Sequence, residues 1–154
     1  MNASPSAWDR KFLDLAQFVA GWSKDPSTQV GAVAVGETPN LLSLGYNGFP
    51  PGVADLPDRL HDRDTKYRLV VHGEINALIN AQFRPATLYV THPPCVRCTV
   101  QILAYRSVKR VVSIKPGDDM LSRWGADFEE SRRLFAEAGV TLDLFENIGE
   151  NGGR

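Results

Sequence analysis

From about residue 72 onward, the sequence alternates between stretches typical of helices and short apolar stretches typical of strands. Helices are predicted over residues 72–83, 95–105 and 127–138, and strands over residues 86–91, 108–114 and 139–145. This order favours parallel strands joined by crossover helices that cover the sheet. The second half of the chain is therefore predicted to have an α/β fold.

The first half predicts a helix followed by an antiparallel hairpin. Residues 8–22 carry one apolar stripe at helical spacing. Residues 30–35 form a short apolar run typical of a buried strand, and a second strand is predicted over residues 41–46 after turn residues 37–40. The whole is predicted to be one domain over residues 1–154, a three-layer α/β/α sandwich around a mixed five-stranded sheet.

Two stretches lie outside this pattern. Residues 47–70 are rich in Pro, Gly, Asp and Arg and show no clean periodicity. A structureless stretch of that length is uncommon in a compact domain and is usually functional. The tail from about Asn147 is predicted to be flexible.

Composition favours a small-molecule substrate. The net charge is −1, and Arg and Lys are spread along the chain, whereas proteins that bind polynucleotides usually show a basic footprint. No apolar run reaches the roughly 18 residues that a membrane helix needs. The N-terminus shows no cationic stretch followed by an apolar one, so we expect a cytoplasmic protein without polynucleotide or membrane partners.

Two motifs carry the chemistry. His72-Gly-Glu74 opens one predicted helix, and Pro94-Cys-Val-Arg-Cys98 opens the next. His-x-Glu followed by Pro-Cys-x-x-Cys is the signature of zinc deaminases. One imidazole (His72) and two thiolates (Cys95 and Cys98) would leave the fourth tetrahedral position open for water, as in catalytic zinc sites.

The spacing within the motifs predicts where the metal lies. Cys95 and Cys98 share a helix face, and a helix N-terminus favours their thiolate form. His72 and Glu74 point roughly 200° apart within a helix, so they converge only beyond its N-terminal end. We therefore expect the zinc between two helix N-termini, at the carboxyl edge of the sheet. Glu74 is the expected proton shuttle between water, ring nitrogen N3 and the departing amine.

The cysteine pair also fits other interpretations. It could be a redox dithiol of the thioredoxin-like layout, half of a metal site, or two buried apolar side chains. The upstream His-x-Glu favours the metal site, because redox chemistry does not require it. His92, three residues before Cys95, is a rival ligand but is expected to be a pocket or surface residue, and His61 is expected to be solvated.

Several further segments are similar to one family. They are Ser23-Lys-Asp-Pro-Ser-Thr-Gln-Val-Gly-Ala32, Gly45-Tyr-Asn-Gly-Phe-Pro50, Thr65-Lys-Tyr67, Val71-His-Gly-Glu-Ile-Asn-Ala77 and Leu88-Tyr-Val-Thr91. In order and spacing they resemble the deoxycytidylate (dCMP) deaminase family of the cytidine deaminase superfamily, over roughly residues 8–145. The resemblance implies a cytidine deaminase-like fold and zinc-dependent hydrolytic deamination of dCMP to dUMP and ammonia.

The resemblance also implies site residues. The zinc ligands would be His72, Cys95 and Cys98, with Glu74 as the catalytic acid and base. Asn47 would face the pocket, where its amide could hydrogen-bond the sugar. For the 5′-phosphate the candidates are Lys24 beside Ser23, with Lys66 and Arg68 as alternatives in the long loop.

Family members often form hexamers that dCTP activates and dTTP inhibits, which implies a homo-oligomer here and Mg²⁺ accompanying any triphosphate effector. The chain departs from the family at Gly73 and Thr99, where alanine is common, and it lacks the cysteines of a second, structural zinc.

Other activities of the same fold remain open. The substrate could be a cytosine nucleoside, a triphosphate, a modified cytosine nucleotide, or adenosine in transfer RNA, the last disfavoured by the low basic charge. A catalytically idle nucleotide sensor is disfavoured by the intact Glu74.

Overall fold

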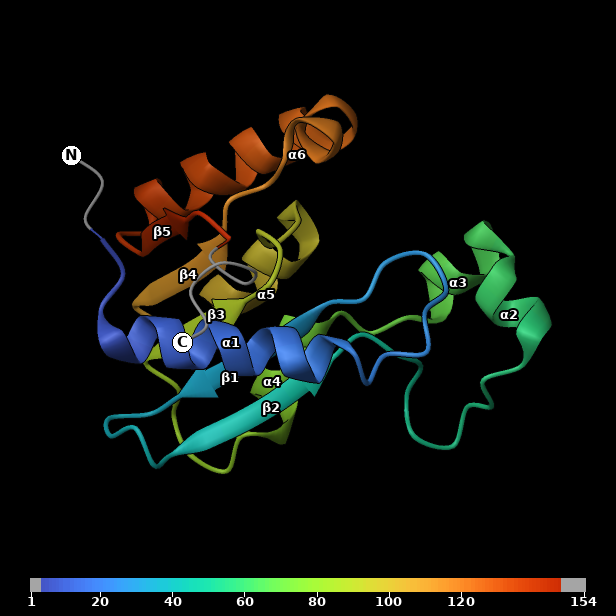
Figure 1. Cartoon of the computed structure of the whole chain (residues 1–154), viewed down its shortest axis with the longest axis horizontal. Helices are drawn as coiled ribbons and strands as arrows, with labels where there is room; N and C mark the ends of the chain where they lie inside the picture. The colour runs from blue at the N-terminus through green and yellow to red at the C-terminus, as the bar shows by residue number, and fades with distance from the viewer. Residues whose placement is uncertain (1–3, 148–154) are drawn as a thin grey trace.

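The computed structural model describes residues 4–147 (Figure 1). A first helix leads into a hairpin, two short helices follow, and strands and helices alternate afterwards. In chain order the elements are α1 (Ala7–Ala20), β1 (Gly31–Val35), β2 (Leu42–Tyr46), α2 (Pro57–His61), α3 (Arg63–Leu69), α4 (Gly73–Asn80), β3 (Thr87–Val90), α5 (Val96–Tyr105), β4 (Arg110–Ile114), α6 (Asp118–Glu137) and β5 (Thr141–Phe145). The part of the tail beyond Asn147, predicted to be flexible, lies outside the described residues.

The strands form one mixed sheet in the order β2-β1-β3-β4-β5. β1 is antiparallel to both β2 and β3, whereas β3, β4 and β5 run parallel to one another. The mixed five-stranded sheet predicted from the sequence is thus confirmed. Its parallel half follows from the two crossover helices, α5 and α6.

Helices cover both faces of the sheet, as Figure 1 shows. On one face, Phe12 and Ala16 of α1 pack against alternate strand residues such as Val33 and Val112. On the other face, α4, α5 and α6 bury Leu78, Ile102 and Phe135 against the intervening residues, including Leu88 and Val111. Every residue of β1 is buried because both of its faces are covered. The three-layer sandwich is confirmed.

The stretch predicted to be structureless, residues 47–70, contains two helices. Pro57 occupies the first turn of α2, where its missing N–H costs nothing, and the Asp62 carboxylate caps α3 by accepting from the Thr65 N–H. At five and seven residues, these helices are too short to show an apolar stripe.

The last helix is also longer than predicted. α6 begins at Asp118 rather than at residue 127, with Asp118 and Asp119 in its first turn, where acidic side chains favour a helix start. The added turns are mostly exposed, which explains the absence of a regular stripe. Within residues 4–147, no helix is both long and apolar enough to cross a membrane.

An almost fully buried carboxylate, Asp9, ties α1 to the middle of the sheet. It accepts hydrogen bonds from the Tyr89 hydroxyl at 2.7 Å and from two Arg110 nitrogens at 2.8 and 3.0 Å. It also completes a capping box with Ser6 at the start of α1. Burial alone would raise the pKa of Asp9, but the bonds from Arg110 and Tyr89 hold that pKa well below its usual range.

We expect Asp9→Asn to lower the free energy of unfolding by about 2–4 kcal/mol at pH 7, because the Tyr89 hydroxyl and two Arg110 nitrogens lose their carboxylate partner, although Arg110 keeps its bond to Asp143. Since folding lowers the pKa of Asp9, its contribution is complete above the unfolded value of about 4 and is lost as the pH falls towards the folded value. Urea unfolding at pH 7 and pH 3 should show the difference shrinking in acid. Asp14→Asn, an exposed change on the same helix, should stay within about 0.5 kcal/mol of wild type.

Candidate active site

Two helix N-termini bring the two motifs together beside the end of β3. His72 is the N-cap residue of α4, and Cys95 is the N-cap residue of α5; both have extended backbones. Because His72 stands before the first helical turn, it and Glu74 are not held on opposite faces of one helix. The position of His72 is fixed by two backbone hydrogen bonds between its neighbour Val71 and Gly48.

Three side chains converge on one point. His72 Nδ1 lies 3.1 Å from Cys98 Sγ and 3.6 Å from Cys95 Sγ. The three ligand atoms all lie within 4.8 Å of one another, the single such group of potential metal ligands between residues 4 and 147. Zinc bonds of roughly 2.0–2.3 Å place the ligands of one tetrahedral ion about 3–4 Å apart. The donor set therefore fits zinc, although the role of these residues as ligands remains a prediction.

Glu74 lies against this group in the first turn of α4. It is only 3% exposed, and its Oε1 lies 3.7 Å from His72 Nδ1. Burial alone would raise the pKa of Glu74, but hydrogen bonds with His72 and Cys98 outweigh burial and lower it. The side chain is therefore a buried carboxylate beside the three potential ligands.

The same contacts set the charge of the group. Two hydrogen bonds lower the pKa of Cys95 to about 5: the bond from the Cys98 thiol has the larger effect, and the bond from His72 has the smaller one. The hydrogen bonds from His72 to Cys95 and to Glu74 raise the pKa of His72 to about 10, and the bond to Cys95 has the larger effect. The pKa of Cys98 is raised because Cys95 and burial both favour its thiol. The lowered pKa values of Cys95 and Glu74 favour the thiolate and the carboxylate, the charged forms that attract a cation.

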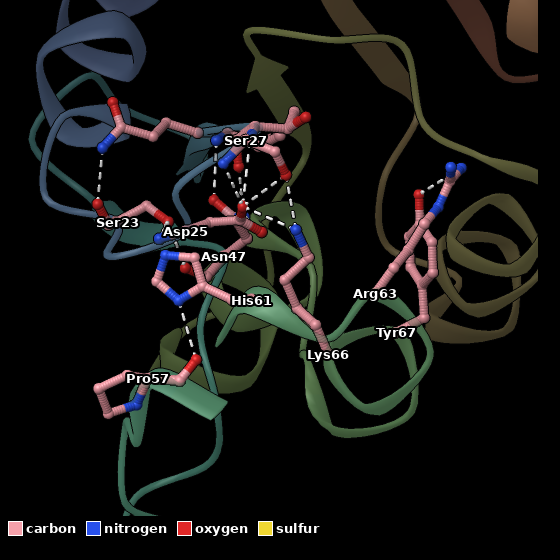
Figure 2. A network of polar contacts seen from close by, with 12 residues as sticks. Ser23, Asp25, Ser27, Asn47, Pro57, His61, Arg63, Lys66 and Tyr67 are labelled. Atoms are coloured by element: carbon pink, nitrogen blue, oxygen red, sulfur yellow. Dashed lines mark hydrogen bonds and ion pairs between the residues drawn. The ribbon is translucent and has the colours of Figure 1, made fainter. Parts of the chain in front are cut away.

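The two other histidines lie outside the group. His92 Nδ1 pairs with Thr91 Oγ1 at 3.0 Å, and burial lowers the pKa of this imidazole. His61 is exposed and its Nδ1 contacts the Pro57 carbonyl at 2.8 Å (Figure 2). These positions agree with the pocket or surface role expected for His92 and the solvated position expected for His61.

A polar network joins the two loops beside the site, with Asp25 at its centre (Figure 2). Asp25 accepts from the N–H groups of Ser27 and Thr28, and its Oδ1 lies 3.0 Å from the ammonium of Lys66, which reaches in from α3. Both side chains of this ion pair are about nine-tenths buried. The pair fixes α3 and the long loop against the segment before β1.

Ser23 and Asn47 belong to the same network. The Ser23 hydroxyl donates to the Asn47 carbonyl at 2.8 Å. The Asn47 side chain accepts from the Val30 N–H and donates to the Thr28 carbonyl, each at 2.8 Å. Both residues are buried, at 4% and 6% exposure. Their side chains hold the loops together. Contacts of Ser23 and Asn47 with the substrate stay a prediction.

The structure does not bring the residues expected to bind the 5′-phosphate to the metal group. Lys24 points into solvent and pairs with Asp55 at 3.0 Å. Lys66 is buried on Asp25, so its charge is already matched, and Arg68 is exposed on α3. The structure gives Lys66 a role in loop packing where the sequence suggested a possible phosphate contact.

The sequence did not point to a cavity whose lining includes the residues directly before Pro94 of the second motif. It has a volume of about 370 Å³, and its lining includes Gln17, Gln29, Thr91, His92, Lys115 and Met120. Lys115 directly follows the end of β4, one of the parallel strands. Ligands of open α/β sheets bind outside the carboxyl ends of such strands, a signal that could have singled out Lys115.

Comparison with known proteins agrees with this geometry. The family model described as "Cytidine and deoxycytidylate deaminase zinc-binding region" matches residues 6–115, which contain both motifs. The chain belongs to this deaminase family. It is 39% identical over 139 residues to an uncharacterized deaminase in the luxG 3′ region of Aliivibrio fischeri, covering 89% of this chain and 92% of that relative.

Deoxycytidylate deaminases are among the other family members that match. The mouse enzyme is 36% identical over 149 residues, covering 90% of this chain and 79% of the relative, and the human enzyme is 34% identical with the same coverage. A crystal structure of dCMP deaminase from cyanophage S-TIM5, in complex with dCMP and dUMP, superposes with a TM-score of 0.68. At 22% identity, covering 88% of this chain and 95% of the other, it supports the fold.

The two departures from the family pattern have different surroundings. A methyl group on Gly73 would lie 3.0 Å from the Val30 carbonyl oxygen and 3.3 Å from the Tyr46 Cα, so alanine would fit only if the neighbouring backbone moved by a few tenths of an ångström. Thr99 is fully buried, and its hydroxyl has no hydrogen-bond partner among the described residues. Neither residue belongs to the ligand group.

Proposed function

We propose that this protein is a zinc-dependent deaminase that hydrolyses dCMP to dUMP and ammonia. The observation that carries the proposal is the convergence of His72, Cys95 and Cys98 around one point, with the buried carboxylate of Glu74 beside them. Family membership supports the reaction, and the mouse and human deoxycytidylate deaminases support the choice of substrate.

His72, Cys95 and Cys98 would hold the zinc. When bound, the zinc would supply Lewis acidity that lowers the pKa of water at such a site. The two cysteines sit at the N-terminus of α5, whose backbone N–H groups favour thiolates; the Cys98 N–H lies 3.5 Å from Cys95 Sγ. One imidazole and two thiolates leave room for water and substrate.

Glu74 is the proposed proton carrier. Its lowered pKa keeps it ionised near neutral pH, so it can accept the proton of the attacking water. It would deliver that proton to N3 of the cytosine ring as water adds to C4. It would then transfer the second proton to the amino group, which leaves as ammonia. Water is consumed, dUMP is formed, and Glu74 returns to its starting state.

Other features remain proposals from the family resemblance. We propose a single catalytic domain, a cytoplasmic location, and a homo-oligomer, such as a hexamer, that responds to dCTP and dTTP. Mg²⁺ would accompany either triphosphate. A free nucleotide, rather than a polynucleotide, is the proposed partner, since the net charge of the chain is only −1 and no block of basic residues occurs in it.

A comparison of four substrates tests the proposed function. Ammonia release from the zinc-loaded protein is measured with dCMP, CMP, deoxycytidine and dCTP at equal concentration. We expect kcat/KM for dCMP to exceed that for deoxycytidine at least about tenfold, because a site built around a polar group rejects the analogue that lacks it. Equal turnover of dCMP and deoxycytidine, or faster turnover of dCTP or CMP, would assign the enzyme to another cytosine substrate.

A further inference from the structure

Asp127 stands well inside α6, although the sequence predicted that a helix begins at this residue. Aspartate is a weak helix former, because its short carboxylate suits the ends of helices better than their interiors. The Asp127 carboxylate accepts a hydrogen bond from the Val96 N–H at 3.1 Å, across 31 residues of sequence. Val96 is the first residue of α5. Asp127 therefore caps the start of a neighbouring helix and not the start of its own.

The first turn of α5 has backbone N–H groups that find no acceptor within the helix. The Cys98 N–H points to Cys95 Sγ at 3.5 Å, and the Thr99 N–H donates to the Cys95 carbonyl at 2.8 Å. The Val96 N–H donates to Asp127. No residue of this first turn is acidic, so the carboxylate that caps it comes from α6. The turn that carries both cysteines is thus tied to another helix by one side chain.

Of the two cysteines, Cys95 depends more on this bond. Cys98 lies inside α5, which is anchored in the core under the sheet through Ile102. Cys95 is the N-cap residue, and the Val96 N–H belongs to the peptide that directly follows it. A bond to that N–H fixes the plane of this peptide and so the direction in which the Cys95 side chain leaves the backbone. Metal ligands keep their bonding distances to within about 0.2 Å, so a small rotation of the peptide would disturb a metal bond.

We propose that Asp127 is a positioning residue for the metal group. Its carboxylate holds the peptide after Cys95, which keeps Cys95 Sγ directed at the point where His72 and Cys98 converge. The proposal rests on the proposed function, since it assumes that these three side chains hold the zinc. The bond reaches the backbone of α5 and not a ligand side chain, so Asp127 acts through the position of Cys95. An asparagine would offer a carbonyl oxygen of similar reach, which separates the hydrogen bond from the negative charge.

Zinc affinity, measured by competition with a chelator, tests the proposal without turnover. It is compared among wild type, Asp127→Ala, Asp127→Asn and the matched control Glu130→Ala, which removes an exposed acidic side chain from the same helix. We expect Asp127→Ala to weaken zinc binding about tenfold, the lower end of the cost of removing a supporting residue around a metal site. Asp127→Asn should stay within about threefold of wild type, because it keeps the acceptor. Glu130→Ala should bind zinc as wild type does.

Cobalt(II) in place of zinc gives a second readout that a merely structural role would not change. Its visible absorption bands respond to the geometry of the thiolate ligands. We expect Asp127→Ala to shift these bands and Asp127→Asn to preserve them. If Asp127 only joins α6 to α5, Asp127→Ala will lower the unfolding temperature of the metal-free protein and leave zinc affinity and the cobalt bands unchanged. That result would overturn the proposal.

The remaining outcomes separate this proposal from the proposed function. Zinc binding that is as weak in Asp127→Asn as in Asp127→Ala would overturn positioning by the hydrogen bond. A wild-type protein that takes up no zinc would overturn both proposals together. If zinc affinity and the cobalt bands depend on Asp127 while dCMP is not deaminated, the role of Asp127 stands and the proposed reaction is wrong.

Discussion

The Glu74→Gln variant is expected to bind zinc as wild type does and to lose about 10²–10⁴-fold in kcat with dCMP. Glutamine has nearly the same size as glutamate, so it fits the buried position in the first turn of α4. Its amide cannot accept a proton from water and pass it on. Chemistry should therefore fail while the three potential zinc ligands keep their places.

Zinc content by mass spectrometry and steady-state ammonia release provide the two readouts for Glu74→Gln. The control is Glu37→Gln, an exposed glutamate in the turn between β1 and β2. This control should retain both zinc and wild-type kcat. Wild-type turnover in Glu74→Gln would remove Glu74 from the mechanism, and loss of zinc there would show that its carboxylate supports the metal.

The second large effect is expected for Cys98→Ser, which should weaken zinc binding at least about 100-fold and abolish activity at limiting zinc. Removal of supporting residues around a zinc site already costs about 10–100-fold, and loss of a thiolate ligand removes a metal bond itself. A serine hydroxyl remains protonated at neutral pH, so it cannot replace the thiolate. Zinc retained after dialysis against a weak chelator gives the measurement.

Thr99→Val is the matched control for Cys98→Ser. It changes the next residue of α5, which is equally buried, and removes a hydroxyl that lacks a partner among the described residues. Valine has a similar shape, so this variant should keep one zinc per chain and unfold at the same temperature as wild type or a higher one. One zinc per chain in Cys98→Ser would contradict the proposed ligand set.

Much of the fold and the metal group could be predicted from local patterns. The alternation after residue 72 predicted the parallel strands, because crossover helices leave few other arrangements. The spacing of His72 and Glu74 required the metal to lie beyond the helix end. In the structure His72 is the N-cap residue of α4 and Glu74 lies within the helix, so both side chains can converge beyond the helix end, and the metal there stays a prediction.

What the sequence did not predict depends on contacts between distant segments. Lys66 and Asp25 are 41 residues apart, and only the folded chain shows that they neutralise each other. The first turns of α6 likewise carry no apolar stripe from which the sequence could have predicted a helix. The cavity near Lys115 is lined by residues from five separate parts of the chain, around Gln17, Gln29, Thr91, Lys115 and Asn147.

Product formation with and without metal is the measurement that tests zinc-dependent hydrolysis of dCMP. The protein is stripped of metal with a chelator, divided, and one half is reloaded with one equivalent of zinc before dCMP is added. We expect dUMP and ammonia in equal amounts from the reloaded half and neither product from the stripped half. Equal dUMP formation in both halves, or none in the zinc-loaded half, would contradict it.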